Sequence, residues 1–416
     1  MLLVLAGAVA GCAGYTLMPT PNLYLAGSGY PSDRIPPALR SSHVELFYIT
    51  DRARQPQQAP HRVYGSQRSK SLAFGSARVG IGSDAIWEEL VAASGARNRQ
   101  RRLRLRLQEV HELGRFPETP APFHVVDGVI VDDPEAVEAE RIAGERFRAE
   151  LERRLDATGV REAILFVHGF NTTFEKAALL HAEVWHFLGR WGVPIVYSWP
   201  AASGGALGYV SDRESGEFTV FHLKQVLRQL AATRGLERIH ILAHSRGTDV
   251  ATSALRELVI ETRAAGRDPL EVFRIANLVL AAPDLDFGTV GQRLIAERFG
   301  PAFGRITIYT AQTDRALDVS ELLFGGVRFG RVQTKDLGER ERKIFRAVGN
   351  VHIVEVRGAT DTFRHEYFHS SPEASTDLVL VLRDGLEPGT PDRPLIHEQG
   401  NFWSIPRGYR LEERGE

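Results

Sequence analysis

The sequence predicts an α/β fold built on a doubly wound, mostly parallel sheet. From residue 163 onward, short apolar runs alternate with longer stretches of helical periodicity. The apolar runs are continuous, which is typical of parallel strands buried on both faces. Connections between parallel strands are right-handed, so their carboxyl ends share the sheet edge where ligands bind. Polar side chains that directly follow these runs are therefore the candidates for a functional site.

The expected elements follow one another along the chain. The N-terminal part supplies a helix at residues 134–155 and strands at 44–50, 71–81 and 103–110. Strands of the regular part are expected at residues 163–167, 194–198, 238–242, 276–282, 305–310 and 352–356. Helices between them are expected at residues 174–189, 218–233, 248–263, 287–299 and 316–324. We find no insertion large enough to form a cap domain.

Composition restricts the class of protein. The 416 residues are 43% hydrophobic and 25% charged, which is ordinary for a soluble globular chain of one large or two smaller domains. A net charge of −1 argues against a polyanionic partner. Arginines concentrate only at residues 97–106, where they alternate with leucine and lack interleaved aromatics, so we expect a solvated strand and no nucleic-acid binding.

The N-terminus is typical of an exported protein. Residues 1–11 are apolar and uncharged, too short to span a bilayer, and fit a signal peptide, although no Lys or Arg precedes them. The sequence Val-Ala-Gly-Cys ending at Cys12 resembles a bacterial lipobox, and Cys12 is the sole cysteine. We expect a lipoprotein anchored on the periplasmic side of the bacterial envelope, with residues 12–40 as an unpacked tether; a chance cysteine is the alternative.

A candidate nucleophile follows the strand at residues 238–242. Residues 243–247 read Ala-His-Ser-Arg-Gly, a small-x-Ser-x-Gly pattern that is typical of a nucleophile elbow. The tight turn requires small residues two positions before and after the serine. Ala243 and Gly247 meet this requirement, although Ala243 stands where Gly is more usual. Ser245 is therefore expected at the end of the strand with its hydroxyl exposed.

A base and an acid follow in the chain order of the α/β-hydrolase triad, Ser245, Asp314, His365. A serine hydroxyl needs a base to take its proton, and an imidazole with a pKa of about 6.5 can do so at neutral pH. Asp314 follows the strand at residues 305–310, and a carboxylate on the far ring nitrogen holds the tautomer. The amides of Phe170 and Arg246 are the expected oxyanion donors.

Several assignments stay open. Asp284 follows the preceding strand and rivals Asp314, although it could instead cap a helix, as could Asp286. His369 rivals His365 as the base. His168 and His244 are expected to be scaffold residues. The Arg246 side chain is expected to point to solvent.

Two alternatives belong to other functional classes. His365, Glu366 and His369 match the H-E-x-x-H pattern of zinc hydrolases. Pro372 would end that helix within a turn, and no third ligand motif follows, so we expect no metal. A non-catalytic interaction module of the cell envelope is the other alternative.

Together these motifs resemble the bacterial α/β-hydrolase family DUF900 over residues 40–375. The matching segments are LFVHGFNTTF (165–174), YSWP (197–200), ILAHSRG (241–247), AAPDLD (281–286) and HEYF (365–368). MPTP at residues 18–21 resembles the family's lipoprotein-like members, and Arg246 replaces the family's usual Met. The resemblance implies an α/β-hydrolase domain at 41–380, divided at residue 160 into N-terminal strands and helix and a catalytic core, with a C-terminal extension at 381–416.

The function implied is that of an esterase- or lipase-like serine hydrolase. We expect it to cleave carboxylic esters, small or lipid, through an acyl-enzyme and without a cofactor. Lipase or lysophospholipase, amidase and thioesterase activities use the same triad and stay open. Residues 201–217 are expected to line the substrate pocket.

Overall fold

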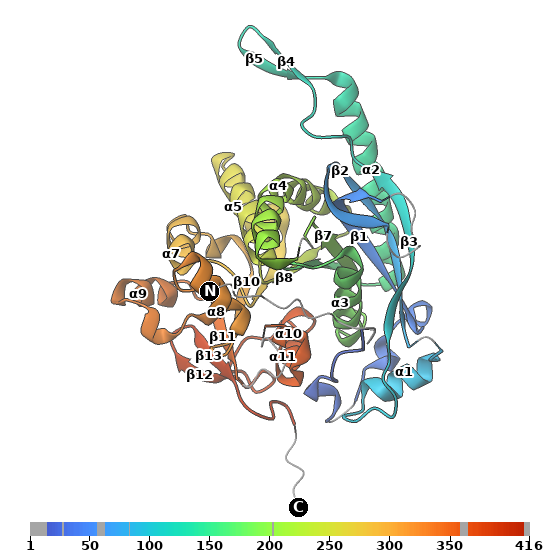
Figure 1. The fold of residues 1–416 in the computed structure, drawn as a ribbon, viewed down its shortest axis with the longest axis vertical. Coiled ribbons are helices and arrows are strands. Elements are labelled where there is room, and N and C mark those ends of the chain that lie inside the picture. Colours follow the sequence, from blue (N-terminus) through green and yellow to red (C-terminus); the bar gives the residue numbers. More distant parts are fainter. Residues whose placement is uncertain are drawn as a thin grey trace, which may run out of the picture.

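The computed structural model describes residues 15–26, 29–55, 63–82, 84–201, 204–357 and 365–411. Figure 1 shows one large twisted sheet with helices on both faces and an arm that projects from the body. The predicted signal peptide and the lipidation at Cys12 fall on residues 1–14 and so lie outside the described residues. No helix in the described ranges is both long enough and apolar enough to cross a membrane.

Within the described residues, the sheet has eleven strands and is parallel through its centre. Its order is β12-β13-β11-β10-β9-β8-β6-β7-β1-β2-β3. The parallel strands are β1 (His43–Arg54), β6 (Glu162–Val167), β7 (Val193–Ser198), β8 (Arg238–His244), β9 (Ile275–Ala281), β10 (Arg305–Thr310), β11 (Val351–Val356) and β13 (Phe402–Ile405). The antiparallel strands at the two edges are β2 (Tyr64–Ile81), β3 (Leu105–Arg115) and β12 (Ile396–Gln399). The predicted α/β class is confirmed.

Helices cover the sheet on both faces (Figure 1). One face carries α1 (Trp87–Ser94), α3 (Phe174–Phe187), α10 (Tyr367–Ser370) and α11 (Pro372–Leu382). The other carries α2 (Pro134–Thr158), α4 (Gly205–Ala232), α5 (Gly247–Ala264), α6 (Pro269–Phe273), α7 (Phe287–Val290) and α9 (Glu339–Ala347). The helix α8 (Arg315–Phe324) follows β10, and a separate hairpin is formed by β4 (Phe123–Val126) and β5 (Val129–Asp132).

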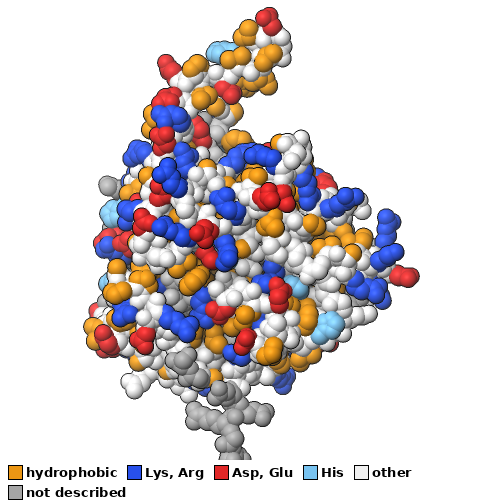
Figure 2. Space-filling view, turned by 180° about the vertical axis from the view of Figure 1, so that it is seen from behind, with side chains coloured by type: hydrophobic (Ala, Val, Ile, Leu, Met, Phe, Trp, Pro, Cys, Tyr) orange, Lys and Arg blue, Asp and Glu red, His pale blue; other side chains and the backbone are white. Residues whose placement is uncertain are grey.

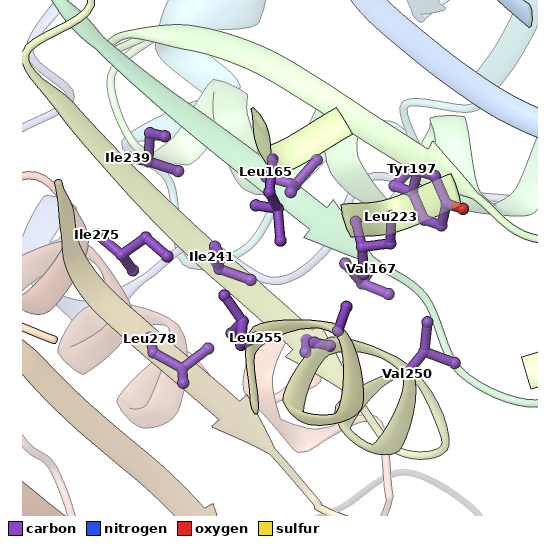
Figure 3. Packing of buried hydrophobic residues seen from close by; sticks show 14 of the residues in the cluster. Leu165, Val167, Tyr197, Leu223, Ile239, Ile241, Val250, Leu255, Ile275 and Leu278 are labelled. Atoms are coloured by element: carbon purple, nitrogen blue, oxygen red, sulfur yellow. The ribbon is translucent and has the colours of Figure 1, made fainter. Parts of the chain in front are cut away.

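Continuous apolar strands supply two cores at once. Along β6, Ile164 and Phe166 join the cluster on one face of the sheet, while Leu165 and Val167 join the cluster on the other. Alternation of side chains along a strand produces this division, and each fully buried aliphatic side chain contributes about 1.5–3 kcal/mol. Figure 3 shows Leu165 and Val167 beside Ile241 of β8 and Val250 of α5. The strand that leads to the candidate nucleophile, β8, is therefore buried in the centre of the sheet.

The prediction that residues 12–40 form an unpacked tether is wrong for their described part. Tyr24, Tyr30 and Ile35 belong to the core on the α3 face. The Leu17 amide donates to the Leu103 carbonyl over 2.8 Å, so this segment pairs with the chain entering β3. The glycines and prolines of this segment suggest a linker, but its aromatic side chains pack into the core and hold the segment there.

The regular elements also differ from prediction in three places. Residues 205–217, expected in a loop, are the first turns of α4. The helix expected at 287–299 is interrupted by a π-helical segment at Gly291–Ile295. The strands β12 and β13 extend the sheet beyond β11, the last strand that was predicted.

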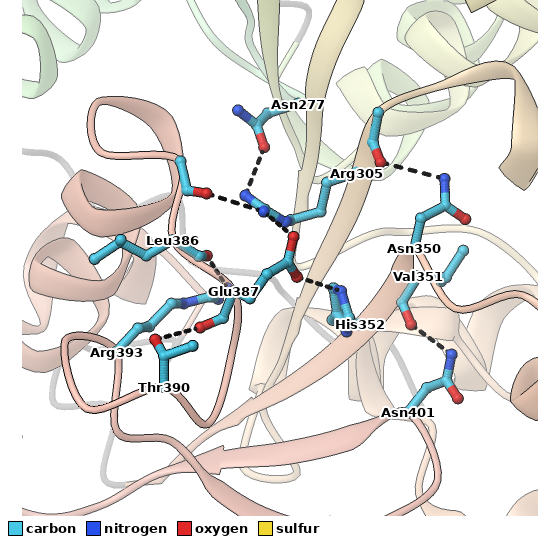
Figure 4. Close-up of polar contacts among 12 residues, drawn as sticks. Asn277, Arg305, Asn350, Val351, His352, Leu386, Glu387, Thr390, Arg393 and Asn401 are labelled. Atoms are coloured by element: carbon cyan, nitrogen blue, oxygen red, sulfur yellow. Dashed lines mark hydrogen bonds and ion pairs between the residues drawn. The ribbon is translucent and has the colours of Figure 1, made fainter.

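Polar contacts fix the C-terminal residues to the sheet (Figure 4). Arg305 of β10 pairs with Glu387, and Asn401 donates to the Val351 carbonyl over 2.7 Å. Arg393 is fully buried and bonds both carboxylate oxygens of Asp377, each over 2.8 Å. The extension beyond residue 380 is therefore part of the folded body.

We predict that Asp377→Asn lowers the free energy of unfolding by about 3–5 kcal/mol, because it leaves the buried Arg393 charge without a counter-charge. Urea denaturation followed by circular dichroism measures the change. The matched control is Asp384→Asn, which breaks the partly exposed pair with Arg383 and should cost about 1 kcal/mol or less. Equal effects of the two substitutions would contradict the prediction.

Candidate active site

The turn between β8 and α5 holds Ser245 in a strained conformation. Its φ is +52°, in the left-handed region that costs a non-glycine residue about 1–3 kcal/mol. The Ser245 amide donates to the Ala281 carbonyl over 2.9 Å, and its carbonyl accepts from the Thr248 hydroxyl over 2.6 Å. These bonds hold the turn in a nucleophile-elbow conformation. Ser245 is 7% exposed, less than the sequence predicted.

Two glycines let the loop after β6 approach this turn. A Cβ on Gly247 would lie 2.6 Å from the Val167 carbonyl oxygen, and no side chain can be accommodated there. A Cβ on Gly169 would lie 2.8 Å from the Cβ of Ser245 and 3.1 Å from the His244 carbonyl oxygen. The loop at residues 168–172 is therefore pressed directly against the turn.

The candidate oxyanion donors lie at this contact. Phe170 belongs to the loop, and Arg246 directly precedes α5. Within the described ranges, no residue accepts a hydrogen bond from the amide of either one. The next amide, that of Asn171, is already bonded to the buried Asp212 carboxylate over 3.0 Å. Two unpaired amides beside Ser245 are what an oxyanion needs.

Arg52 supports the loop, a role that was not predicted from the sequence. This side chain is fully buried at the end of β1 and donates to the carbonyls of Thr172 over 2.6 Å and Ala201 over 2.8 Å. It also contacts His168, whose ring stacks on Trp199. Burial lowers the pKa of Arg52 to about 9. The one available signal was a polar Thr-Asp-Arg sequence at the end of a strand.

The structure brings His365 and Asp314 together. The Nδ1 of His365 donates to the Oδ2 of Asp314 over 2.7 Å. Asp314 is fully buried, and its other oxygen accepts the amides of Ala316 and Leu317, which begin α8. The carboxylate is therefore fixed by the helix that it caps. Burial alone would lower the pKa of His365, but the hydrogen bond and charge of Asp314 outweigh it and raise the pKa above 6.5.

His244 connects His365 to the elbow. Its Nε2 donates to the His365 carbonyl over 3.2 Å, and the two rings lie 4.9 Å apart between centroids. Burial, followed by the charge of His365, lowers the pKa of His244, so it is neutral. His365 thus contacts Asp314 directly and the turn of Ser245 through the residue that precedes the serine.

The rival acid Asp284 has different partners. Its carboxylate accepts the hydroxyls of Tyr209 over 2.6 Å and Ser320 over 2.8 Å, and it lies 3.6 Å from Arg328. Asp284 thereby joins α4, β9 and α8. Asp286 accepts the Thr289 amide over 2.7 Å and caps α7. The structure therefore brings Asp314 to His365 and leaves the two other aspartates in structural contacts.

The rival base His369 is also held elsewhere. It is buried beside Glu183 at 3.0 Å and Glu366 at 3.8 Å. Burial alone would lower its pKa, but these carboxylates raise the pKa of His369 to about 9. Glu366 pairs with Lys176 over 2.6 Å, and His365 lies outside the short helix α10. The H-E-x-x-H pattern therefore does not form one helix face, and the described ranges hold no cluster suited to a metal ion.

Glu183 is a second residue that the sequence analysis missed. It is fully buried within α3 and accepts the Tyr15 hydroxyl over 2.6 Å and the Met18 amide over 2.8 Å, besides pairing with His369. A glutamate between apolar residues in the middle of a mostly apolar helix was the signal that could have found it. Through this carboxylate the N-terminal segment contacts the loop that carries His365.

The expectation that the Arg246 side chain points to solvent is wrong. Arg246 is buried and pairs with Asp249, one turn into α5, over 2.7 Å. A cation directly after the candidate nucleophile is therefore neutralised within the protein. Its buried position fixes the residue whose amide is the candidate oxyanion donor.

Comparison with known proteins identifies the family of this chain. A search of the curated proteins finds no match. The family model described as "Alpha/beta hydrolase of unknown function (DUF900)" matches residues 143–382. That range is more than half of the chain and contains Ser245, Asp314 and His365 as well as both candidate oxyanion donors. The chain therefore belongs to the DUF900 family of α/β hydrolases.

Proposed function

We propose that this hydrolase is a serine esterase whose nucleophile is Ser245, with His365 as the base and Asp314 as its partner. The observation that carries the proposal is the 2.7 Å hydrogen bond between Asp314 and His365 next to the strained turn of Ser245. Strain of this kind persists only where the surrounding structure enforces it, and it occurs at functional sites.

The proposed reaction assigns a role to each of these residues. The Oγ of Ser245 attacks the ester carbonyl carbon while the Nε2 of His365 takes the hydroxyl proton. The amides of Phe170 and Arg246 donate to the oxyanion. His365 then gives its proton to the departing alcohol, which leaves an acyl group on Ser245. Water, deprotonated by His365, releases the acid and restores the enzyme.

One observed contact supports a substrate with an apolar acyl group. The rings of Phe170 and Tyr209 lie 5.3 Å apart beside the elbow and offer an apolar wall to an acyl group. Lipid esters, thioesters and amides use the same triad, and the substrate panel below separates them.

We predict that Ser245→Ala abolishes both labelling by a fluorophosphonate probe and hydrolysis of p-nitrophenyl esters, because both require the serine oxygen. Labelling on gels and initial rates with acetyl to palmitoyl esters are the measurements, with matched amides, thioesters and phospholipids alongside. Ser211→Ala, an exposed serine on α4, is the control. Activity that survives Ser245→Ala but is lost to a chelator would establish the metal mechanism instead, and a folded chain that is never labelled would favour an interaction module.

We predict that kcat/KM rises with pH, with a midpoint above 6.5, because His365 must be neutral to accept the proton and Asp314 raises its pKa. Asp314→Asn removes the charge while keeping the helix cap. Burial then dominates, so the midpoint moves to lower pH, and kcat falls by about 10⁴-fold. Rates measured from pH 5 to 9 test both effects. A larger loss in Asp284→Asn would show that Asp284 is the acid.

We predict that Gly169→Ala lowers kcat by about 100-fold or more, because the new methyl group displaces the loop and withdraws the Phe170 amide from the oxyanion. The cause is steric, since the Cβ would lie 2.8 Å from that of Ser245. The control is Gly216→Ala, where a Cβ meets only Val250 at 3.4 Å. Ester kinetics with circular dichroism test this, and equal rates in the two variants would contradict it.

A further inference from the structure

The hairpin of β4 and β5 exposes apolar side chains on both of its faces. Val125 pairs with Ile130, and Val126 with Val129, so successive pairs point to opposite sides. Six large apolar side chains are between 45% and 68% exposed: Phe123, Val125, Val126, Val129, Ile130 and Val131. An isolated two-stranded hairpin is at best marginally stable in water. A contiguous apolar surface of this kind marks a site of interaction.

The first turns of α2 hold this hairpin away from the body (Figure 1). Ala143 is the first buried residue of the helix, and the Glu140 carboxylate accepts a hydrogen bond from Gln225 of α4 over 2.7 Å, so residues 134–139 project from the body over about 9 Å. Asp133 caps the helix at the junction by accepting the amides of Glu135 and Ala136. We call residues 121–142 the arm. A capped helix is a rigid support, so the arm presents the hairpin in a defined position.

The charge of the arm narrows the choice of partner. The arm has one Arg, Arg141, which pairs with Glu138 over 2.6 Å, and no Lys. Its other acidic residues are Asp127, Asp132, Asp133, Glu135 and Glu140. Figure 2 shows apolar and acidic side chains at its free end. An anionic lipid surface would repel such a segment, since membrane-binding helices carry Lys and Arg. Two arms placed together would also repel each other. The arm therefore requires an apolar surface surrounded by cations.

The same chain offers such a surface at α9. A cavity of about 280 Å³ lies between α9, β10 and the π-helical segment, and it is lined by Leu294, Ile308, Phe345 and other apolar residues. Arg298 lines this cavity, and Arg342 and Arg346 line a neighbouring pocket that shares Phe345 with it. The helix α9 also carries Arg340 and Lys343, besides the acidic Glu339 and Glu341. The cavity is nearly twice as large as an engineered cavity of about 150 Å³ that binds benzene.

We propose that the hairpin of one copy of this chain docks into the α9 cavity of a second copy. The aliphatic side chains of the hairpin fill the cavity, and the carboxylates of the arm pair with the cations around it. Figure 1 shows the arm at the top of the body and α9 far from it at the left edge, so the contact forms between copies. The two surfaces differ, so the contact closes as a reciprocal dimer or continues from copy to copy.

The first test is the oligomeric state of the full chain by analytical ultracentrifugation at micromolar concentrations. A first variant replaces four hairpin residues with Thr, which keeps strand propensity and removes the apolar surface: Val125, Val126, Val129 and Ile130. A second variant carries Arg342→Glu and Arg346→Glu. Each should raise the Kd of self-association at least tenfold and leave ester hydrolysis unchanged. The matched controls, Ile86→Thr with Ile260→Thr and Arg102→Glu with Arg106→Glu, should leave the Kd unchanged.

Mixing the two variants gives the decisive result. One retains an intact α9 surface and the other an intact hairpin, so the mixture should form mixed dimers although each alone is a monomer. Raising the salt concentration should weaken them, because it screens the charges. A monomeric wild-type chain, self-association that survives the α9 reversal, or a mixture that stays monomeric would overturn the proposal. The last two results would assign the hairpin to another partner.

Discussion

The site depends on the close approach of two backbone segments, the turn at Ser245 and the loop after β6. Gly247 and Gly169 permit it, since a methyl group on either would collide with the other segment. The parallel pairing of β6 with β8 brings the two strand ends to the same level of the sheet. The buried apolar side chains of these strands provide the energy that holds Ser245 in its left-handed conformation. The packing of the core therefore also determines the geometry of the candidate site.

Around this centre, buried charges each join segments that lie far apart in the sequence. Asp314 joins α8 to His365, Arg52 joins β1 to the loop after β6, and Asp284 joins α4, β9 and α8. A buried charge is expensive unless it is fully bonded, so each one specifies a single arrangement of its neighbours. Burial of Arg246 against Asp249 follows the same rule. The candidate site is rigid for this reason, and losing one partner disturbs more than one element.

Local patterns in the sequence were sufficient for the class of fold and for the candidate residues. Continuous apolar runs predicted β6 to β11, and the spacing around Ser245 predicted the turn. Contacts between distant segments could not be predicted. The packing of Tyr24 and Tyr30 on α3 and the support of the loop by Arg52 depend on residues more than a hundred positions away. The burial of Arg246 depends on how the folded chain surrounds it. The Gly and Pro content of the N-terminal segment suggested a linker, because the tertiary contacts of Tyr24 and Tyr30 cannot be read from the local sequence.

Glu183 shows why the N-terminal segment matters to the proposed chemistry. His369 follows His365 by four residues, and its pairing with Glu183 fixes the short helix beyond the base. Tyr15 and Met18 in turn donate hydrogen bonds to Glu183. These two residues lie outside the matched family range and fix a carboxylate that lies within it. With a pKa of about 9, His369 is charged at neutral pH, and the pair persists there. The three residues of the H-E-x-x-H pattern thus have separate partners: His365 contacts Asp314, Glu366 contacts Lys176 and His369 contacts Glu183.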